Sequence, residues 1–154
     1  MKRWSILASF ALLSACAHAK IPRTNIDDTE ANREIIALVE RYHEALESLD
    51  ADAVLSMVSP RFYEDNGNTN DADDYDYNGL KMQLVEDFKR TRALQLDVRV
   101  DAVEVKESEA YAELYYRIRA QNEYPSGVKW ETGSDRTRLR FERADGKWLI
   151  VAGL

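Results

Sequence analysis

The sequence predicts an α+β fold in which three N-terminal helices come first and an antiparallel sheet follows. Apolar residues recur at three- and four-residue spacing in the first part of the chain, which is the period of an amphipathic helix. After Thr91 the spacing changes to two, the period of a half-buried strand. Because helical and strand segments are segregated along the chain, an α+β arrangement is favoured over a parallel sheet with alternating helices. Each strand has one apolar and one charged face, so helices are expected to cover one side only.

The chain length and composition exclude several function classes. The 154 residues correspond to about one domain. Lys and Arg number 21 against 28 Asp and Glu, a formal net charge of −7, which argues against nucleic acid as a partner because binding it needs a basic surface. One cysteine, Cys16, and two histidines, His18 and His43, rule out disulfide frameworks and Cys/His zinc clusters. We expect no cofactor.

The first residues have the pattern of a secretory signal. Lys2 and Arg3 form a basic start, and residues 4–15 are apolar apart from three serines, a run shorter than the about 20 residues that span a bilayer. The run ends in the letters LSAC, of which the last is Cys16, and this tetrapeptide resembles the lipobox of bacterial lipoproteins. The resemblance implies that residues 1–15 are removed and that Cys16 receives acyl chains such as palmitate, which insert in the lipid bilayer.

The residue after the cysteine is Ala17 rather than Asp, which in the sorting rule of Gram-negative lipoproteins implies a periplasm-facing anchor in the outer membrane. Residues 16–27 would then be a lipidated tether, and residues 28–154 one domain. An alternative stays open, because the letters AHA ending at Ala19 form a site for ordinary signal cleavage. Cleavage there would release a soluble periplasmic or secreted protein.

Three amphipathic helices are expected before the sheet. Asp28 or Thr29 can cap a long first helix, and Asp50 can cap a short second helix that Pro60 ends. A polar stretch over residues 64–79 is loop-like, and a third helix follows it. The apolar stripe of the first helix comprises Ile35, Leu38, Val39, Tyr42, Leu46 and Leu49, and that of the third comprises Leu80, Leu84, Val85 and Phe88.

Four alternating stretches predict the strands. They cover residues 94–105, 112–120, 136–142 and 147–153. The alternation slips near Asp101 and Ala102, which indicates a β-bulge, and the pair Asp145-Gly146 is typical of a hairpin turn. Arginines on the polar strand faces are interpreted as a solvated surface with cross-strand Arg–Glu pairs, the alternative being a surface for an anion or a partner.

Two segments resemble the nuclear-transport-factor-2-like, or SnoaL-like, superfamily. Residues 39–65 (VERYHEALESLDADAVLSMVSPRFYED) combine a long helix that carries an aromatic residue, an Asp-capped short helix and an apolar run ending in an acid. Residues 145–150 (DGKWLI) are similar to the last hairpin of that family. The resemblance implies a curved antiparallel sheet wrapped around helices, a cone with a pocket at its wide end. The family includes ketosteroid isomerase, polyketide cyclases and scytalone dehydratase, and also binding modules without catalysis, so the fold does not specify the function.

The resemblance to ketosteroid isomerase suggests four catalytic candidates. Tyr42 would donate a hydrogen bond to a developing enolate, and Asp65 would move the proton, although the spacing between their segments is one residue shorter here. Asp135 lies one position from the site of the third acid, and we expect it to point to the wrong face of the sheet. His43 could act as a general base. In the structural interpretation, Tyr42 belongs to the core, His43 to its boundary and Asp65 to an exposed loop.

A calcium site is a further candidate. Asp74, Asp76 and Asn78 precede Gly79 in the order D-x-D-x-N-G, the first half of a calcium loop. The acid that such a loop needs at its twelfth position is replaced by Val85. Weak Ca²⁺ binding is one reading, and the other is a solvated loop whose acids favour the N-terminus of the following helix.

Three hypotheses on function follow. The leading one is an envelope lipoprotein whose cone-fold domain, without catalysis, binds a small apolar ligand or an envelope protein. The second is an isomerase, cyclase or dehydratase that uses acid and base residues of the pocket. The third is a homodimer joined through the open sheet face. Converging polar groups in the pocket would favour the enzyme, and a purely apolar or filled pocket would favour docking.

Overall fold

The computed structural model describes residues 19–154, so the predicted signal peptide with Cys16 and His18 lies outside the described residues. The elements are α1 (Glu30–Glu47), α2 (Ala51–Ser56), β1 (Tyr63–Glu64), the 3₁₀ turn η1 (Asp71–Asp73), β2 (Tyr75–Asp76), α3 (Tyr77–Arg90), β3 (Thr91–Lys106), β4 (Glu109–Tyr124), β5 (Gly127–Ala144) and β6 (Lys147–Ala152). A four-stranded antiparallel sheet has the order β3-β4-β5-β6, and the short strands β1 and β2 form a second sheet. The predicted α+β class is confirmed.

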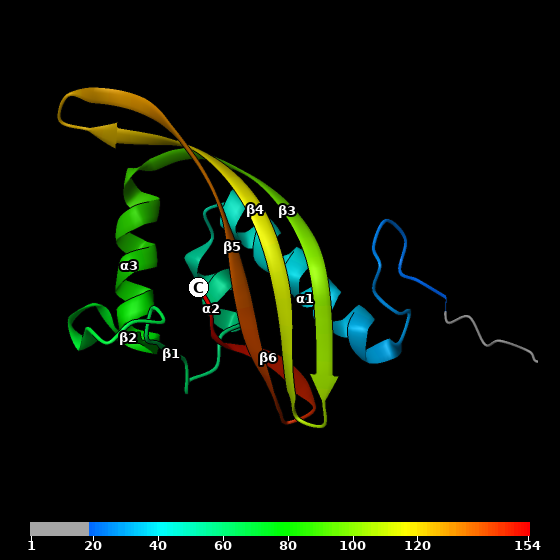
Figure 1. The fold of residues 1–154 in the computed structure, drawn as a ribbon. Helices are drawn as coiled ribbons and strands as arrows, with labels where there is room; N and C mark the ends of the chain where they lie inside the picture. Colours follow the sequence, from blue (N-terminus) through cyan, green and yellow to red (C-terminus); the bar gives the residue numbers. More distant parts are fainter. Residues whose placement is uncertain (1–18) are drawn as a thin grey trace, which may run out of the picture.

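The helices lie on one side of the curved four-stranded sheet (Figure 1). The core forms where α1 and α2 meet the inner face of β4, β5 and β6. Its fully buried side chains include Ile35, Leu38, Val54, Phe62, Leu139, Phe141 and Ile150. At the edge of this core the Trp148 indole nitrogen donates to Glu34 Oε2 at 3.0 Å, which joins β6 to α1. Within residues 19–154 no helix combines the length and hydropathy needed to cross a bilayer.

Side-chain caps determine where the helices begin. Thr29 Oγ1 accepts from the backbone N–H of Asn32 at 3.2 Å, and Asp50 accepts from that of Ala53 at 2.9 Å, as predicted. The third helix begins at Tyr77, earlier than expected, because Asp76 accepts two first-turn N–H groups at 3.0 and 2.9 Å. The stretch predicted as a loop therefore contains β1, η1, β2 and the start of α3.

The pairing of the strands confirms two predicted irregularities. The β3–β4 register shifts between Val100 and Ala102, where the bulge was expected. Asp145 and Gly146 adopt φ angles of 49° and 77°, as a tight two-residue hairpin between β5 and β6 requires.

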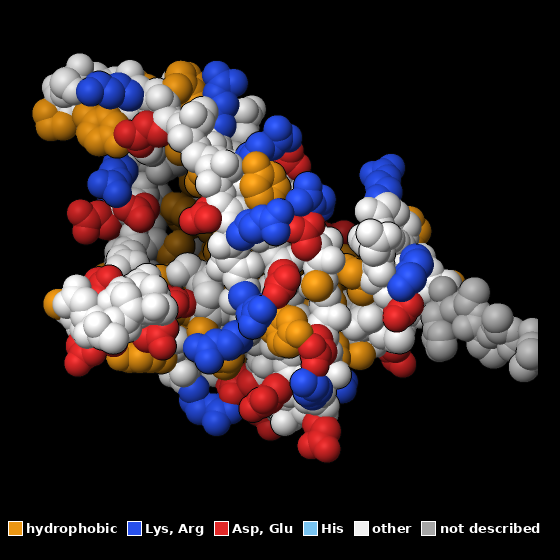
Figure 2. Space-filling model, in the orientation of Figure 1, with side chains coloured by type: hydrophobic (Ala, Val, Ile, Leu, Met, Phe, Trp, Pro, Cys, Tyr) orange, Lys and Arg blue, Asp and Glu red, His pale blue; other side chains and the backbone are white. Residues whose placement is uncertain are grey.

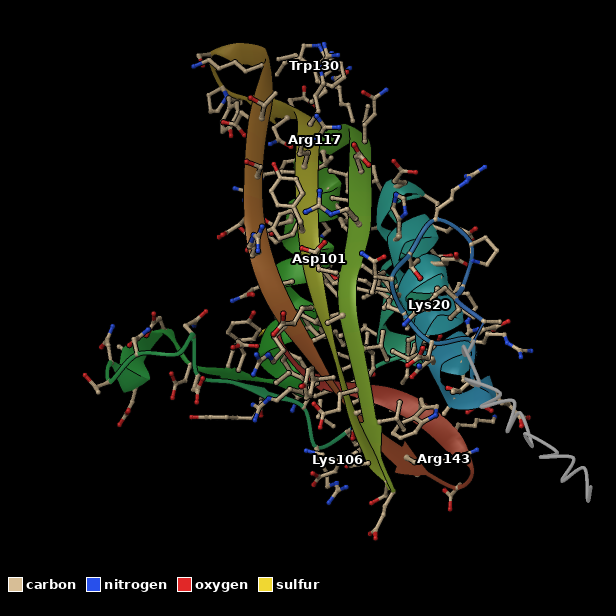
Figure 3. All side chains as sticks on the ribbon, turned by 45° about the vertical axis from the view of Figure 1, so that its right-hand side comes forward. Lys20, Asp101, Lys106, Arg117, Trp130 and Arg143 are labelled. Atoms are coloured by element: carbon tan, nitrogen blue, oxygen red, sulfur yellow. The ribbon has the colours of Figure 1, made fainter. Side chains whose placement is uncertain are left out.

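The hairpin of β4 and β5 is much longer than the sequence indicates. Strand β5 begins at Gly127, whereas the alternation is visible only from Arg136 onward. Residues 127–136 are all exposed, so no inward-facing apolar residue marks them as a strand. The outer part of the hairpin, with Trp130, extends over the end of α3 (Figures 1 and 3).

The outer face of the sheet carries ion pairs. Arg138 Nη2 lies 2.5 Å from Glu113 Oε1 on the neighbouring strand, and the Arg117 guanidinium pairs with the Asp97 carboxylate. Figure 3 shows Arg117 and Asp101 on this face. These pairs agree with the interpretation of a solvated sheet face that carries cross-strand pairs of Arg with acidic residues.

The segment before α1, predicted as a tether, is folded from Ala19 onward. The backbone N–H of Asp28 donates to the Ala19 carbonyl at 2.7 Å, and Lys20 Nζ lies 2.7 Å from Asp27 Oδ1. The turn buries Ile26, which is 5% exposed. The compact unit therefore begins about nine residues before the predicted domain boundary.

Candidate functional site

A cavity of about 480 Å³ lies between α1 and the inner face of the sheet. This volume is within the range of small-molecule sites, about 300–1,000 Å³. Its apolar lining comprises Val39, Leu46, Leu96, Val98, Leu114, Ile118 and Leu139. Its polar side chains comprise Tyr42, His43, Glu64, Asn66, Tyr116, Asp135, Arg136 and Thr137. Three of the four predicted catalytic residues are therefore gathered at one cavity.

Helix α1 brings Tyr42 into this cavity. Tyr42 lies between Val39 and Leu46 on the helix face turned toward the sheet. Residues three and four positions apart share one face of a helix, so the Tyr42 ring points into the cavity. Within residues 19–154 the Tyr42 hydroxyl has no hydrogen-bond partner. Burial, followed by the nearby hydroxyls of Tyr75 and Tyr116, raises its pKa well above the ordinary tyrosine value. The hydroxyl is therefore protonated and available to a ligand at neutral pH.

This raised pKa predicts a loss of stability in alkali. The unfolded tyrosine has a pKa of about 10 and the folded one a higher value, so above pH 10 the unfolded state binds fewer protons. The free energy of unfolding should then fall with pH, and Tyr42 should contribute up to about 1.4 kcal/mol per pH unit to that slope. In urea unfolding between pH 9 and 11, Tyr42→Phe should have a shallower slope than the wild type. Equal slopes would contradict the assignment.

His43 lies beside Tyr42 at the edge of the cavity. Its Nε2 atom is buried and has no hydrogen-bond partner among the described residues, and it lies 3.5 Å from Glu47 Oε2. The other carboxylate oxygen of Glu47 accepts from the backbone N–H of Leu96 at 2.7 Å. Glu47 thus connects α1 to β3 and places a negative charge next to the imidazole.

The acid that lines the cavity after β1 is Glu64, not the predicted Asp65. Glu64 Oε2 accepts from the backbone N–H of Gly153 at 2.5 Å, and Oε1 accepts from that of Asn66 at 3.2 Å. Asp65 is exposed and accepts from the backbone N–H of Gly67 at 3.0 Å. The base predicted from the family resemblance is therefore outside the cavity.

Strand alternation explains this one-residue difference. Phe62 is buried, Tyr63 is half exposed and Glu64 again points inward, so side chains on β1 alternate as in any strand. Counting by two from Phe62 would have identified Glu64. The polar composition of residues 64–79 conceals this alternation, because it is typical of a loop.

Asp135 lies on the inner face, and the expectation that it points to the wrong face is wrong. It is paired in register with Tyr116 of β4, which alternates with the inward-facing Leu114 and Ile118. Burial and then the Asp135 carboxylate raise the pKa of Tyr116. Asp135 lies on the same face of β5 as Thr137, two residues further along, whose hydroxyl donates to the Gly153 carbonyl at 3.0 Å.

Two of the three predicted calcium ligands have other partners. Asp74 accepts a hydrogen bond from the Tyr63 hydroxyl, and Asp76 caps α3. Within the described range, residues 19–154, no group of three or more His, Cys, Asp or Glu side chains is placed to hold a metal ion. The arrangement of these acids agrees with their reading as a capping loop.

The comparisons with known proteins bear on the fold. No family model and no curated protein matches the chain. Among solved structures, a conserved protein from Planctomyces limnophilus is similar with a TM-score of 0.69 and 14% identity over 80% of this chain and 92% of that one. A ketosteroid isomerase-like protein from Erwinia carotovora atroseptica has a TM-score of 0.66 and 13% identity, and the match covers 81% of this chain and 94% of that one. An NTF2-like protein of unknown function from Pseudomonas putida has a TM-score of 0.64 and 16% identity, and the match covers 80% of this chain and 83% of that one. These similarities show that the chain has the α+β cone fold of NTF2-like proteins.

Proposed function

We propose that the domain binds a small ligand with an apolar body, without transforming it, at the periplasmic side of a bacterial outer membrane. The observation that carries the proposal is the cavity of about 480 Å³, which combines apolar walls with several polar side chains, among them Tyr42, whose hydroxyl has no partner in the described chain. An apolar enclosure with a few polar groups is typical of small-molecule sites. A cavity of this kind supports a small ligand over the docking of a whole protein.

The placement of the acids favours binding over acid–base catalysis. A base in the manner of ketosteroid isomerase needs to reach the ligand, and Asp65 is exposed outside the cavity. Glu64 does line it, but its carboxylate is already engaged by two backbone N–H groups, those of Gly153 and Asn66. The enzymatic alternative retains one supporting observation, that Tyr42, His43 and Asp135 line the same cavity.

The proposed location rests on the lipobox-like letters that end at Cys16. If Cys16 is the lipidated terminus, three residues lie between it and Lys20 of the folded turn, so the chain makes four residue steps. At most about 3.6 Å per residue, the chain then spans roughly 14 Å. Such a short connection would hold the domain directly against the bilayer. Cleavage after Ala19 would instead remove the carbonyl that accepts the Asp28 N–H.

Filling the cavity tests the binding function. The chain carrying Cys16→Ser can be studied without detergent, and N-phenyl-1-naphthylamine is a neutral probe whose fluorescence rises in apolar surroundings. We expect saturable binding, and Val98→Trp should weaken it about tenfold or more, because the indole would occupy space that the probe needs. The matched control is Val128→Trp, at a side chain that is 44% exposed on the hairpin, and it should bind like the parent.

Two results would contradict this function. Saturable binding that Val98→Trp leaves intact, with a native circular dichroism spectrum, would place the probe elsewhere. Turnover of a ketosteroid or a related enolisable ketone, lost in both Tyr42→Phe and Asp135→Asn, would establish the enzymatic alternative instead.

A further inference from the structure

The side-chain charges that face the cavity are mostly negative. Glu64 and Asp135 both contribute carboxylates to its lining. Arg136 also borders the cavity, but it is paired with Tyr115 on the opposite face of the sheet, and its Nη1 lies 4.0 Å from Asp101 Oδ2. Its charge is therefore directed to the outer face.

The remaining titratable group of the lining is matched by an acid of its own. The Nε2 atom of His43 lies 3.5 Å from Glu47 Oε2, so a proton on this nitrogen would be balanced by the Glu47 carboxylate. His43 thus adds no net positive charge to the site when it is protonated.

The chain segment next to the cavity adds further negative charge. Residues 64–76 contain six acidic and no basic residues, and two members of this segment, Glu64 and Asn66, belong to the lining. Figure 2 shows acidic side chains on the β1–β2 segment and around the hollow between α3 and the β4–β5 hairpin. A cleft lined by one sign of charge with low-dielectric walls concentrates ions of the opposite sign.

Two aromatic residues complete the environment. Tyr42 and Tyr116 line the cavity, and a tyrosine ring attracts a cation through its electron-rich face. The unpartnered Tyr42 hydroxyl can also accept a hydrogen bond from an ammonium N–H. Carboxylates, tyrosines and apolar walls together suit a molecule with a positive head and an apolar body.

We propose that the ligand of this cavity is an organic cation, a protonated amine or quaternary ammonium carried on an apolar or aromatic body. The proposal rests on the binding function above and specifies its ligand class. Asp135 is the principal counter-charge, because its carboxylate accepts one backbone hydrogen bond, from Arg136 N–H at 2.7 Å, whereas the Glu64 carboxylate accepts two. The head lies toward Asp135 and Tyr116, and the body against Val98 and Leu114.

Three probes that share a naphthalene ring and differ in the charge of their polar group test whether the cavity prefers a cation. 2-Naphthylmethylammonium, 2-naphthalenemethanol and 2-naphthoate differ in charge while keeping the same rings. Measured by calorimetry on the Cys16→Ser chain, the cation should bind about tenfold more tightly than the alcohol, and the naphthoate most weakly. The preference should decrease with added salt, because Asp135 lies where solvent reaches it.

A pair of isosteric variants assigns the preference to the cavity. Asp135→Asn should reduce the affinity for the cation until the ratio of the cation and alcohol affinities is about one. Asp65→Asn removes a carboxylate from the neighbouring exposed loop and should leave the preference intact. Equal binding of cation and alcohol, or a preference that Asp135→Asn retains, would overturn the cation proposal but not the binding function. Failure of all three probes to bind would overturn both.

Discussion

Replacing Gly153 by alanine is expected to destabilise the domain by about 3 kcal/mol and to distort the cavity. Gly153 has a φ of +95°, and an added Cβ would lie 2.2 Å from the Arg138 carbonyl oxygen and 2.9 Å from its carbon. These are backbone atoms of the neighbouring strand, which cannot yield as a flexible side chain can. Gly153 also donates to Glu64 and accepts from Thr137, so a shift here moves two residues of the cavity lining.

Gly67 provides the matched control. It also has a positive φ, +63°, but a Cβ there would meet nothing within 4 Å. Gly67→Ala should therefore lower the free energy of unfolding by about 1 kcal/mol, the penalty for placing an alanine in a left-handed backbone conformation. Urea unfolding monitored by circular dichroism measures both variants. Equal losses for Gly67→Ala and Gly153→Ala would contradict the close approach of Gly153 to β5.

Replacing Cys16 by serine is expected to move the protein from the membrane fraction to the soluble fraction almost completely. A serine cannot accept the diacylglyceryl group through a thioether. Each buried methylene contributes about 0.8 kcal/mol, so losing two or three acyl chains leaves no comparable attraction to the bilayer. Fractionation in a Gram-negative host and mass spectrometry of the mature N-terminus measure the change.

A neighbouring substitution controls for effects on export. Ser14→Ala keeps a small residue before Ala15 and should leave the protein in the membrane fraction. A mature wild-type protein that begins with a free amine at Lys20 would contradict lipidation, since cleavage after Ala19 removes Cys16 altogether.

Most of the fold could be predicted because its signals are local. The Thr29 and Asp50 caps, the bulge near Ala102 and the Asp145-Gly146 turn each depend on a few neighbouring residues and the known preferences of their type. The outer half of the β4–β5 hairpin could not be predicted in this way. Its residues contact little besides each other, so they carry no inward-outward pattern, and their strand pairing alone defines them.

The candidate site was predicted in part. Tyr42 and His43 are on a long helix whose period fixes their direction, and both line the cavity. Asp65 lies outside the cavity, and Glu64 lines it instead, because β1 has two residues only, too few to show a period, and the family resemblance gave a position one residue away. Glu64 and Gly153 come together across 89 positions of sequence, a contact that depends on the tertiary fold.

The central claim, that the cavity between α1 and the sheet is a ligand site, is tested most directly by locating a bound probe. In a methyl-labelled sample of the Cys16→Ser chain with 2-naphthylmethylammonium, we predict nuclear Overhauser contacts from the naphthalene ring to the methyl groups of Val98, Leu114 and Ile118. Contacts confined to exposed side chains such as Met82 and Val128, with none from the cavity lining, would contradict the claim.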